Sequence, residues 1–161
     1  MYTVLIMCIK EYLIVNIKVR NIMQDARMIR TVLEECCERQ GWNLPIDLVD
    51  YCTHVLHDHV NRPDWEPKPS YAEQFMTMRT TRQAMLLGNE CWFTRAVFPD
   101  MMKKRGINSS YYVDMGTACF DRVLTAHDNP TVRRLRDHFE FTAEVCWTAI
   151  HSKGDMRSMW D

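Results

Sequence analysis

The spacing of apolar residues is the feature that most constrains this chain. From Met23 onward, apolar residues recur every three or four positions, as on one face of an α-helix. The first such run stops at Gly41 and the next begins after Pro45, which suit a helix end and a helix start. Only 5 Gly and 6 Pro occur in 161 residues, too few for the many tight turns of a β-sandwich or barrel. The sequence therefore predicts an all-α fold.

Loop and capping signals divide the helical region. Residues 61–69 hold three prolines and are expected to form an extended loop. Ser70 and Glu73 have the spacing of a capping box, which predicts a third helix starting there. We place Ile46 in the buried stripe of the second helix and Leu86 in that of the third. Further caps at Asn108 and at residues 129–130 complete a compact bundle of five to six helices. It spans residues 23–152 as a single domain, and residues 153–161 form a frayed tail.

Residues 1–22 differ from the rest because they are apolar and β-like. Val15, Ile17 and Val19 alternate with polar residues, as in a strand. One interpretation is an added strand or arm that pairs with another chain. The interpretation we favour is that translation starts at Met23 and that residues 1–22 are upstream sequence.

Charge and cysteine content limit the kinds of partner and the cellular compartment that we expect. Twenty Lys and Arg against 21 Asp and Glu give a net charge of −1, which argues against a general nucleic-acid binder. Lys10 and Glu11 interrupt the apolar N-terminal run too early for a membrane span, so no membrane association is expected. The 7 cysteines show no C-x-x-C spacing, which is typical of reduced cysteines in a cytoplasmic protein.

One helix face carries side chains that could bind a metal. Asp50, His54 and His57 are spaced four and three residues apart, and carboxylate and imidazole groups are ligands for zinc or iron. The alternative is a solvated polar face. The chain has neither the Glu-x-x-His of di-iron bundles nor His-Glu-x-x-His. We therefore favour the polar face and expect no metal and no cofactor.

Catalytic motifs do not occur in the sequence. It has no G-x-S-x-G, no P-loop and no G-x-G-x-x-G, so we expect a non-enzymatic protein without catalytic residues. Arg133, Arg134 and Arg136 oppose the dipole at the start of the predicted last helix, which suggests that they face an acidic partner. Trp65 lies in the proline-rich loop. It either fastens that loop to the bundle or presents an anchor to a partner.

A set of short motifs between about positions 84 and 124 resembles a pattern in a family of uncharacterised bacterial helical proteins. They are L-L-G-N-E-C-W-F at 86–93, V-F-P at 97–99, K-R-G at 104–106 and Y-Y-V-D-M-G at 111–116. Asn89 departs from the Asp usual in that family, and Phe120 stands near a usual Tyr. The resemblance implies a helical fold and supplies no chemistry.

The same stretch has a physical interpretation of its own. Gly88 and Gly116 lie inside helical patterns, where glycine is unfavourable unless two backbones come close, so we expect them to face one another. Tyr111 and Tyr112 cannot both point inward, and one hydroxyl is expected to reach Asn89. This would form a buried hydrogen bond or the floor of a small pocket.

These observations favour a non-enzymatic helical protein that acts by protein–protein interaction, as an adaptor or regulator. Small host-directed phage proteins share this lack of motifs, so a viral origin stays open. The weak candidates for binding are Trp65, Asn89, Tyr111 and Tyr112, and a homodimer is a further option. The alternative is a small-ligand or metal-binding domain, or a motif-poor enzyme. It would use the Asp50/His54/His57 face or the Asn89/Tyr111/Tyr112 region.

Overall fold

The computed structural model describes residues 25–62 and 65–151, and there the chain forms eight helices and no strand. The helices are α2 (Ala26–Gln40), α3 (Ile46–Val60), α4 (Ala72–Thr77), α5 (Thr81–Val97), α6 (Pro99–Lys104), α7 (Ser109–Ala126), α8 (Pro130–Asp137) and α9 (Phe139–His151). The all-α prediction is confirmed, with more helices than the five to six expected. None of these helices is long and apolar enough to cross a membrane. The predicted extension 1–22, a start at Met23 and the tail 153–161 lie outside the described residues.

Two helices expected to be continuous are each divided. The capping box that starts a long helix is Thr80 with Gln83, not Ser70 with Glu73. The short α4 therefore ends before α5 begins, and Ser70 accepts a bond from the Ala72 N–H at 3.3 Å without forming a capping box. The last helix is divided at His138, between α8 and α9. Buried side chains keep helical spacing across that break, so the periodicity alone does not reveal it.

Other predicted helix ends are confirmed. Gly41 ends α2 with φ 68° and donates its N–H to carbonyls of the last turn. Asn108 and Asn129 cap α7 and α8 by accepting backbone N–H bonds with their side chains. The expectation that Ile46 and Leu86 are buried is wrong, because they are 70% and 42% exposed.

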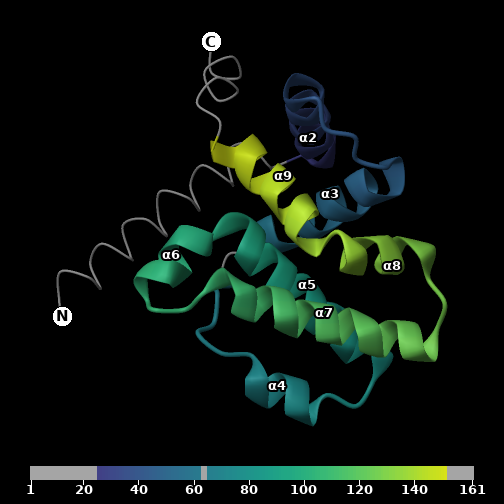
Figure 1. Cartoon of the computed structure of the whole chain (residues 1–161), viewed down its shortest axis with the longest axis vertical. Helices are drawn as coiled ribbons and strands as arrows, with labels where there is room; N and C mark the ends of the chain where they lie inside the picture. The colour runs from purple at the N-terminus through teal and green to yellow at the C-terminus, as the bar shows by residue number, and fades with distance from the viewer. Residues whose placement is uncertain (1–24, 63–64, 152–161) are drawn as a thin grey trace.

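The α5–α7 pair forms the centre of the bundle (Figure 1). Helices α2, α3 and α9 pack on one side of this pair, and α4 lies on the other. The glycines allow close packing, but not by facing one another as expected. A Cβ at Gly88 would lie 2.6 Å from the Phe120 ring, and one at Gly116 would lie 2.5 Å from the Phe139 ring. Each glycine therefore makes room for a phenylalanine.

The core also holds cysteines and one buried polar tie. The Trp92 indole donates to the Thr142 hydroxyl at 3.0 Å and so joins α5 to α9. The six cysteines of the described residues are free and buried, and burial raises the pKa of the Cys119 thiol to about 12. They are Cys36, Cys37, Cys52, Cys91, Cys119 and Cys146.

Candidate functional site

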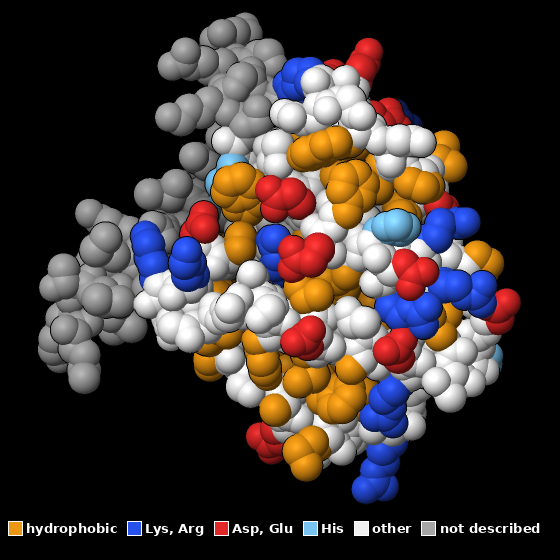
Figure 2. All heavy atoms as spheres, viewed as in Figure 1, with side chains coloured by type: hydrophobic (Ala, Val, Ile, Leu, Met, Phe, Trp, Pro, Cys, Tyr) orange, Lys and Arg blue, Asp and Glu red, His pale blue; other side chains and the backbone are white. Residues whose placement is uncertain are grey.

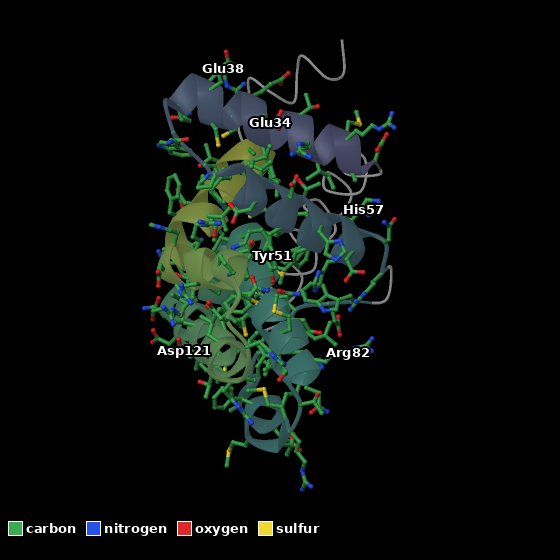
Figure 3. All side chains as sticks on the ribbon, turned by 90° about the vertical axis from the view of Figure 1, so that its right-hand side faces the viewer. Glu34, Glu38, Tyr51, His57, Arg82 and Asp121 are labelled. Carbon is green, nitrogen blue, oxygen red and sulfur yellow. The ribbon has the colours of Figure 1, made fainter. Side chains whose placement is uncertain are left out.

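The face with Asp50, His54 and His57 is occupied by surface contacts. Asp50 pairs with Arg30 of α2 at 2.6 Å, and the Asn61 side-chain nitrogen lies 3.1 Å from His57 Nε2. Figure 3 shows His57 on the outer side of the bundle. In residues 25–62 and 65–151, no group of three His, Cys, Asp or Glu side chains could hold a metal ion. The arrangement of this face is that of a solvated surface.

The structure does not bring Asn89 together with Tyr111 or Tyr112. Asn89 instead accepts a hydrogen bond from the hydroxyl of Tyr51, which reaches from α3 to α5. Figure 3 shows Tyr51 on the inner side of α3. The expected Asn89 tie is thus present with a different tyrosine. Tyr51 was missed because it lies on a separate helix, outside the motifs that drew attention to Asn89.

Tyr111 and Tyr112 both hold the segment that precedes α4. The Tyr112 ring is buried, and its hydroxyl donates to the Lys68 carbonyl at 3.0 Å. Tyr111 is half-buried, and its hydroxyl accepts from the Tyr71 N–H at 3.0 Å and contacts Ser70 Oγ at 3.2 Å. One ring is therefore turned inward and the other outward, as expected. Their hydroxyls fasten residues 68–71 to α7.

Trp65 packs onto the bundle. Its ring centroid lies 5.2 Å from that of His59 and 5.0 Å from that of Phe93. His59 in turn stacks on Phe93 at 4.5 Å, with an interplanar angle of 16°. Of the two interpretations of Trp65, these contacts favour the one in which it fastens the loop.

Two titratable side chains lie under this loop. Burial lowers the pKa of His59, whose Nδ1 lies 2.9 Å from the Val55 carbonyl, so the neutral imidazole is the favoured form. Burial also raises the pKa of Glu90 above its usual range, although Lys68 and the Trp65 indole oppose this shift. Both shifts arise mainly from loss of water around the side chain. They give the region a pH-dependent stability.

The basic residues of α8 bind acidic side chains of the same chain. Arg134 donates to Asp47 of α3, with Nε 2.9 Å from Oδ2. Arg136 pairs with Asp121 at 3.0 Å, and Arg133 pairs with Asp128. The expectation that these three arginines face an acidic partner stays a prediction. Arg134 and Arg136 join α8 to α3 and α7, and Arg133 pairs within the segment that starts α8.

An apolar surface lies at the connection between α2 and α3. We call it the α2–α3 patch, and it consists of Trp42, Leu44, Ile46 and Phe141. Trp42 meets Phe141 of α9 edge to face, with ring centroids 5.9 Å apart. Ile46 is 70% exposed, whereas the other three are half-buried against the core. Figure 2 shows hydrophobic side chains exposed among charged ones over α2 and α9.

The sequence alone did not identify this patch. Trp42 and Leu44 lie in a short connection without periodicity, and Phe141 lies about a hundred residues further on. Ile46 fits the helical spacing of α3 and was assigned to the core. The only nearby indication that Ile46 lies at a helix end was Pro45, which directly precedes it. Comparison of the chain with models of protein families, with curated proteins and with solved structures gives no match.

Proposed function

We propose that the protein works without catalysis, by binding another protein through the α2–α3 patch. The observation that carries this proposal is the 70% exposure of Ile46 at the start of α3, four residues after Trp42, whose half-buried ring packs on Phe141. A soluble protein keeps few large apolar side chains this exposed, and clustered ones mark interaction sites. Trp42 also belongs to the residue type most enriched among the side chains that dominate binding energy.

The patch is partly preorganised. Trp42 and Phe141 hold each other, and the Gly41 cap fixes the start of the connection. Asp47, next to Ile46, is bonded to Arg134 and Thr131 and provides a polar edge. An apolar centre with a polar edge is the usual layout of a protein interface.

The occupant we propose is an apolar segment of a different protein. A stable dimer buries about 800 Å² on each partner. Four side chains, three of them half-buried, expose much less than that, whereas a single helix or extended segment needs less surface. A second copy of this chain is therefore the less favoured occupant, and the experiment distinguishes the two.

The test is native mass spectrometry of tagged protein recovered from the cells in which it naturally functions. We compare wild type with Ile46→Lys and with Met76→Lys, a matched change at a methionine of α4 that is 83% exposed. We expect a stoichiometric protein partner with wild type and Met76→Lys and its loss with Ile46→Lys. Retention of the partner by Ile46→Lys would contradict the proposal. A homodimer that Ile46→Lys dissociates would replace the heterologous partner by a second copy.

A further inference from the structure

A pocket of about 590 Å³ with both polar and apolar lining lies where α6, the start of α7 and α9 come together. It is built at two breaks in the chain, at Pro99 between α5 and α6 and at Gly106 before α7. Figure 2 shows both basic and acidic side chains on the surface between α6 and α9. Its volume is in the range of sites for small organic molecules. It does not include the α2–α3 patch, so it raises a separate question.

Arg95 of α5 forms part of the pocket wall although it is only 9% exposed. Its Nε and Nη2 donate to Glu140 at 3.3 and 3.0 Å, and Nη2 lies 3.5 Å from Glu144 Oε2. These bonds fix the plane of the guanidinium. Within the described residues they leave Nη1, with two N–H donors, without a hydrogen bond. A fixed guanidinium with one free edge is suited to bind an oxyanion.

Other side chains line the same pocket. One of them is Trp147, whose buried indole N–H has no acceptor in the part of the chain that the structure describes. The Asn108 side chain caps α7 by accepting from Ser110, which leaves the Ser109 N–H at the positive end of an 18-residue helix. The exposed Lys103 adds an ammonium group. Buried donors without an acceptor are rare in proteins and call for an explanation.

The acidic side chains of the pocket limit what can bind. Glu144 is already engaged by Arg95, and Asp100 is the other carboxylate of the lining. Two basic and two acidic side chains leave the lining without net charge, which disfavours a polyanion such as nucleic acid. A single acidic group fits, because the Arg95 guanidinium and the Lys103 ammonium group can both donate to it.

We propose that the pocket binds a small organic molecule through a carboxylate or phosphate group. The oxyanion lies against Arg95, Lys103 and the start of α7, and the body of the molecule lies beside Trp147. This site goes beyond the proposed protein interaction and does not depend on it.

The test is a two-dimensional amide NMR titration with benzoate, phenyl phosphate and neutral benzamide as probes. The indole signal of Trp147 is assigned by its absence in Trp147→Phe. We expect benzoate or phenyl phosphate to shift this signal and the Ser109 amide with saturation, and benzamide to shift neither. The acid that binds more tightly identifies the group as a carboxylate or a phosphate.

Two variants locate the binding group. Lys103→Gln should raise the Kd about threefold, the effect of one exposed charge. Arg95→Lys keeps the charge but loses the planar set of N–H donors, and should raise the Kd about tenfold. The matched control Arg82→Gln removes one exposed charge at the start of α5 and should change nothing.

Three results would overturn the proposal. They are no saturable shift with either acid, equal shifts with benzamide, and equal effects of Lys103→Gln and Arg82→Gln. Because Lys103 is exposed, its variant remains informative even if Arg95→Lys does not fold. Ile46→Lys should leave the titration unchanged, so failure of this proposal and failure of the proposed protein interaction can be told apart.

Discussion

The tyrosine region around residues 68–71 and the pocket between α6, α7 and α9 both gather polar groups, but they use them differently. In the tyrosine region the hydroxyls of Tyr111 and Tyr112 bind protein atoms. At the pocket, Arg95 uses Nε and Nη2 to bind Glu140 and Glu144, and its Nη1 makes no hydrogen bond within the described residues. The comparison teaches that a conspicuous motif can serve the fold, whereas the pocket that we propose as a binding site lies outside the paired polar groups.

The largest expected effect tests whether the motif glycines serve packing. Gly116→Ala would place a Cβ 2.5 Å from the buried Phe139 ring, and overpacking of this kind lowers the free energy of unfolding by about 1–3 kcal/mol. Urea denaturation measures the change. The double variant with Phe139→Leu relieves the clash, so its loss should be smaller than the sum of the single losses. Strict additivity would show that Gly116 does not act through Phe139.

Next in size is removal of one hydroxyl from the tyrosine region. Tyr112→Phe leaves the Lys68 carbonyl without its donor and should lower the free energy of unfolding by about 1 kcal/mol. Amide chemical shifts should change in residues 68–71 and stay unchanged around Trp147. A reduced affinity of the pocket for benzoate or phenyl phosphate in this variant would break the distinction between the two regions.

A smaller effect concerns the pH dependence of the loop held by Trp65. Burial lowers the pKa of His59 in the folded state, so the unfolded chain binds a proton first as the pH falls. This part of the stability is complete above about pH 6.5 and is lost as the pH drops through the folded-state pKa. His59→Phe keeps a ring on Phe93 and should flatten the pH profile of urea denaturation between neutral and about pH 5.

Neighbouring charged groups also affect the pH dependence of the stability. Asp58 opposes the shift of His59 and Arg62 adds to it. Glu90 contributes with the opposite sign, because its pKa is raised and its stabilising effect is lost as the pH rises through that value. An unchanged slope in His59→Phe would show that His59 is not the titrating group.

The smallest expected effect is on the pocket side of the comparison. Lys103→Gln should change the free energy of unfolding by no more than about 0.5 kcal/mol, because an exposed side chain away from the core contributes little. Lys103→Gln should thus weaken binding without lowering stability. Tyr112→Phe should do the reverse and lower stability without weakening binding. Thermal unfolding of both variants in parallel shows whether this reversal holds.

Much of the fold could be predicted from the sequence because its signals are local. The glycine at 41 and the asparagines at 108 and 129 stop or cap helices through their own backbone and side chains. The division between α4 and α5 carried an equally local signal, since Thr80 and Gln83 have the capping-box spacing. Ser70 and Glu73 have the same spacing, so the sequence offered two possible helix starts. In the structure, residues 68–71 are held by the hydroxyls of Tyr111 and Tyr112.

The sites could not be predicted in the same way because their parts are far apart in the chain. Arg95 and Trp147 line one pocket only because α5 packs against α9, and Trp42 meets Phe141 only through the turn after α2. Asn89 was expected to bond Tyr111 or Tyr112 and bonds Tyr51 instead, because nothing local in the sequence identifies Tyr51 as the donor. Helical periodicity also does not show whether the first residue of a helix, here Ile46, is covered by a neighbouring helix or exposed.

The buried cysteines can report the order in which the helices separate. A thiol that is shielded from water and held in its protonated form reacts with an alkylating agent only after the surrounding helices separate. The six buried thiols sit on α2, α3, α5, α7 and α9, so each modification is a record that one helix has opened. The order in which they are labelled would show which helix leaves the bundle first, with no probe added to the chain.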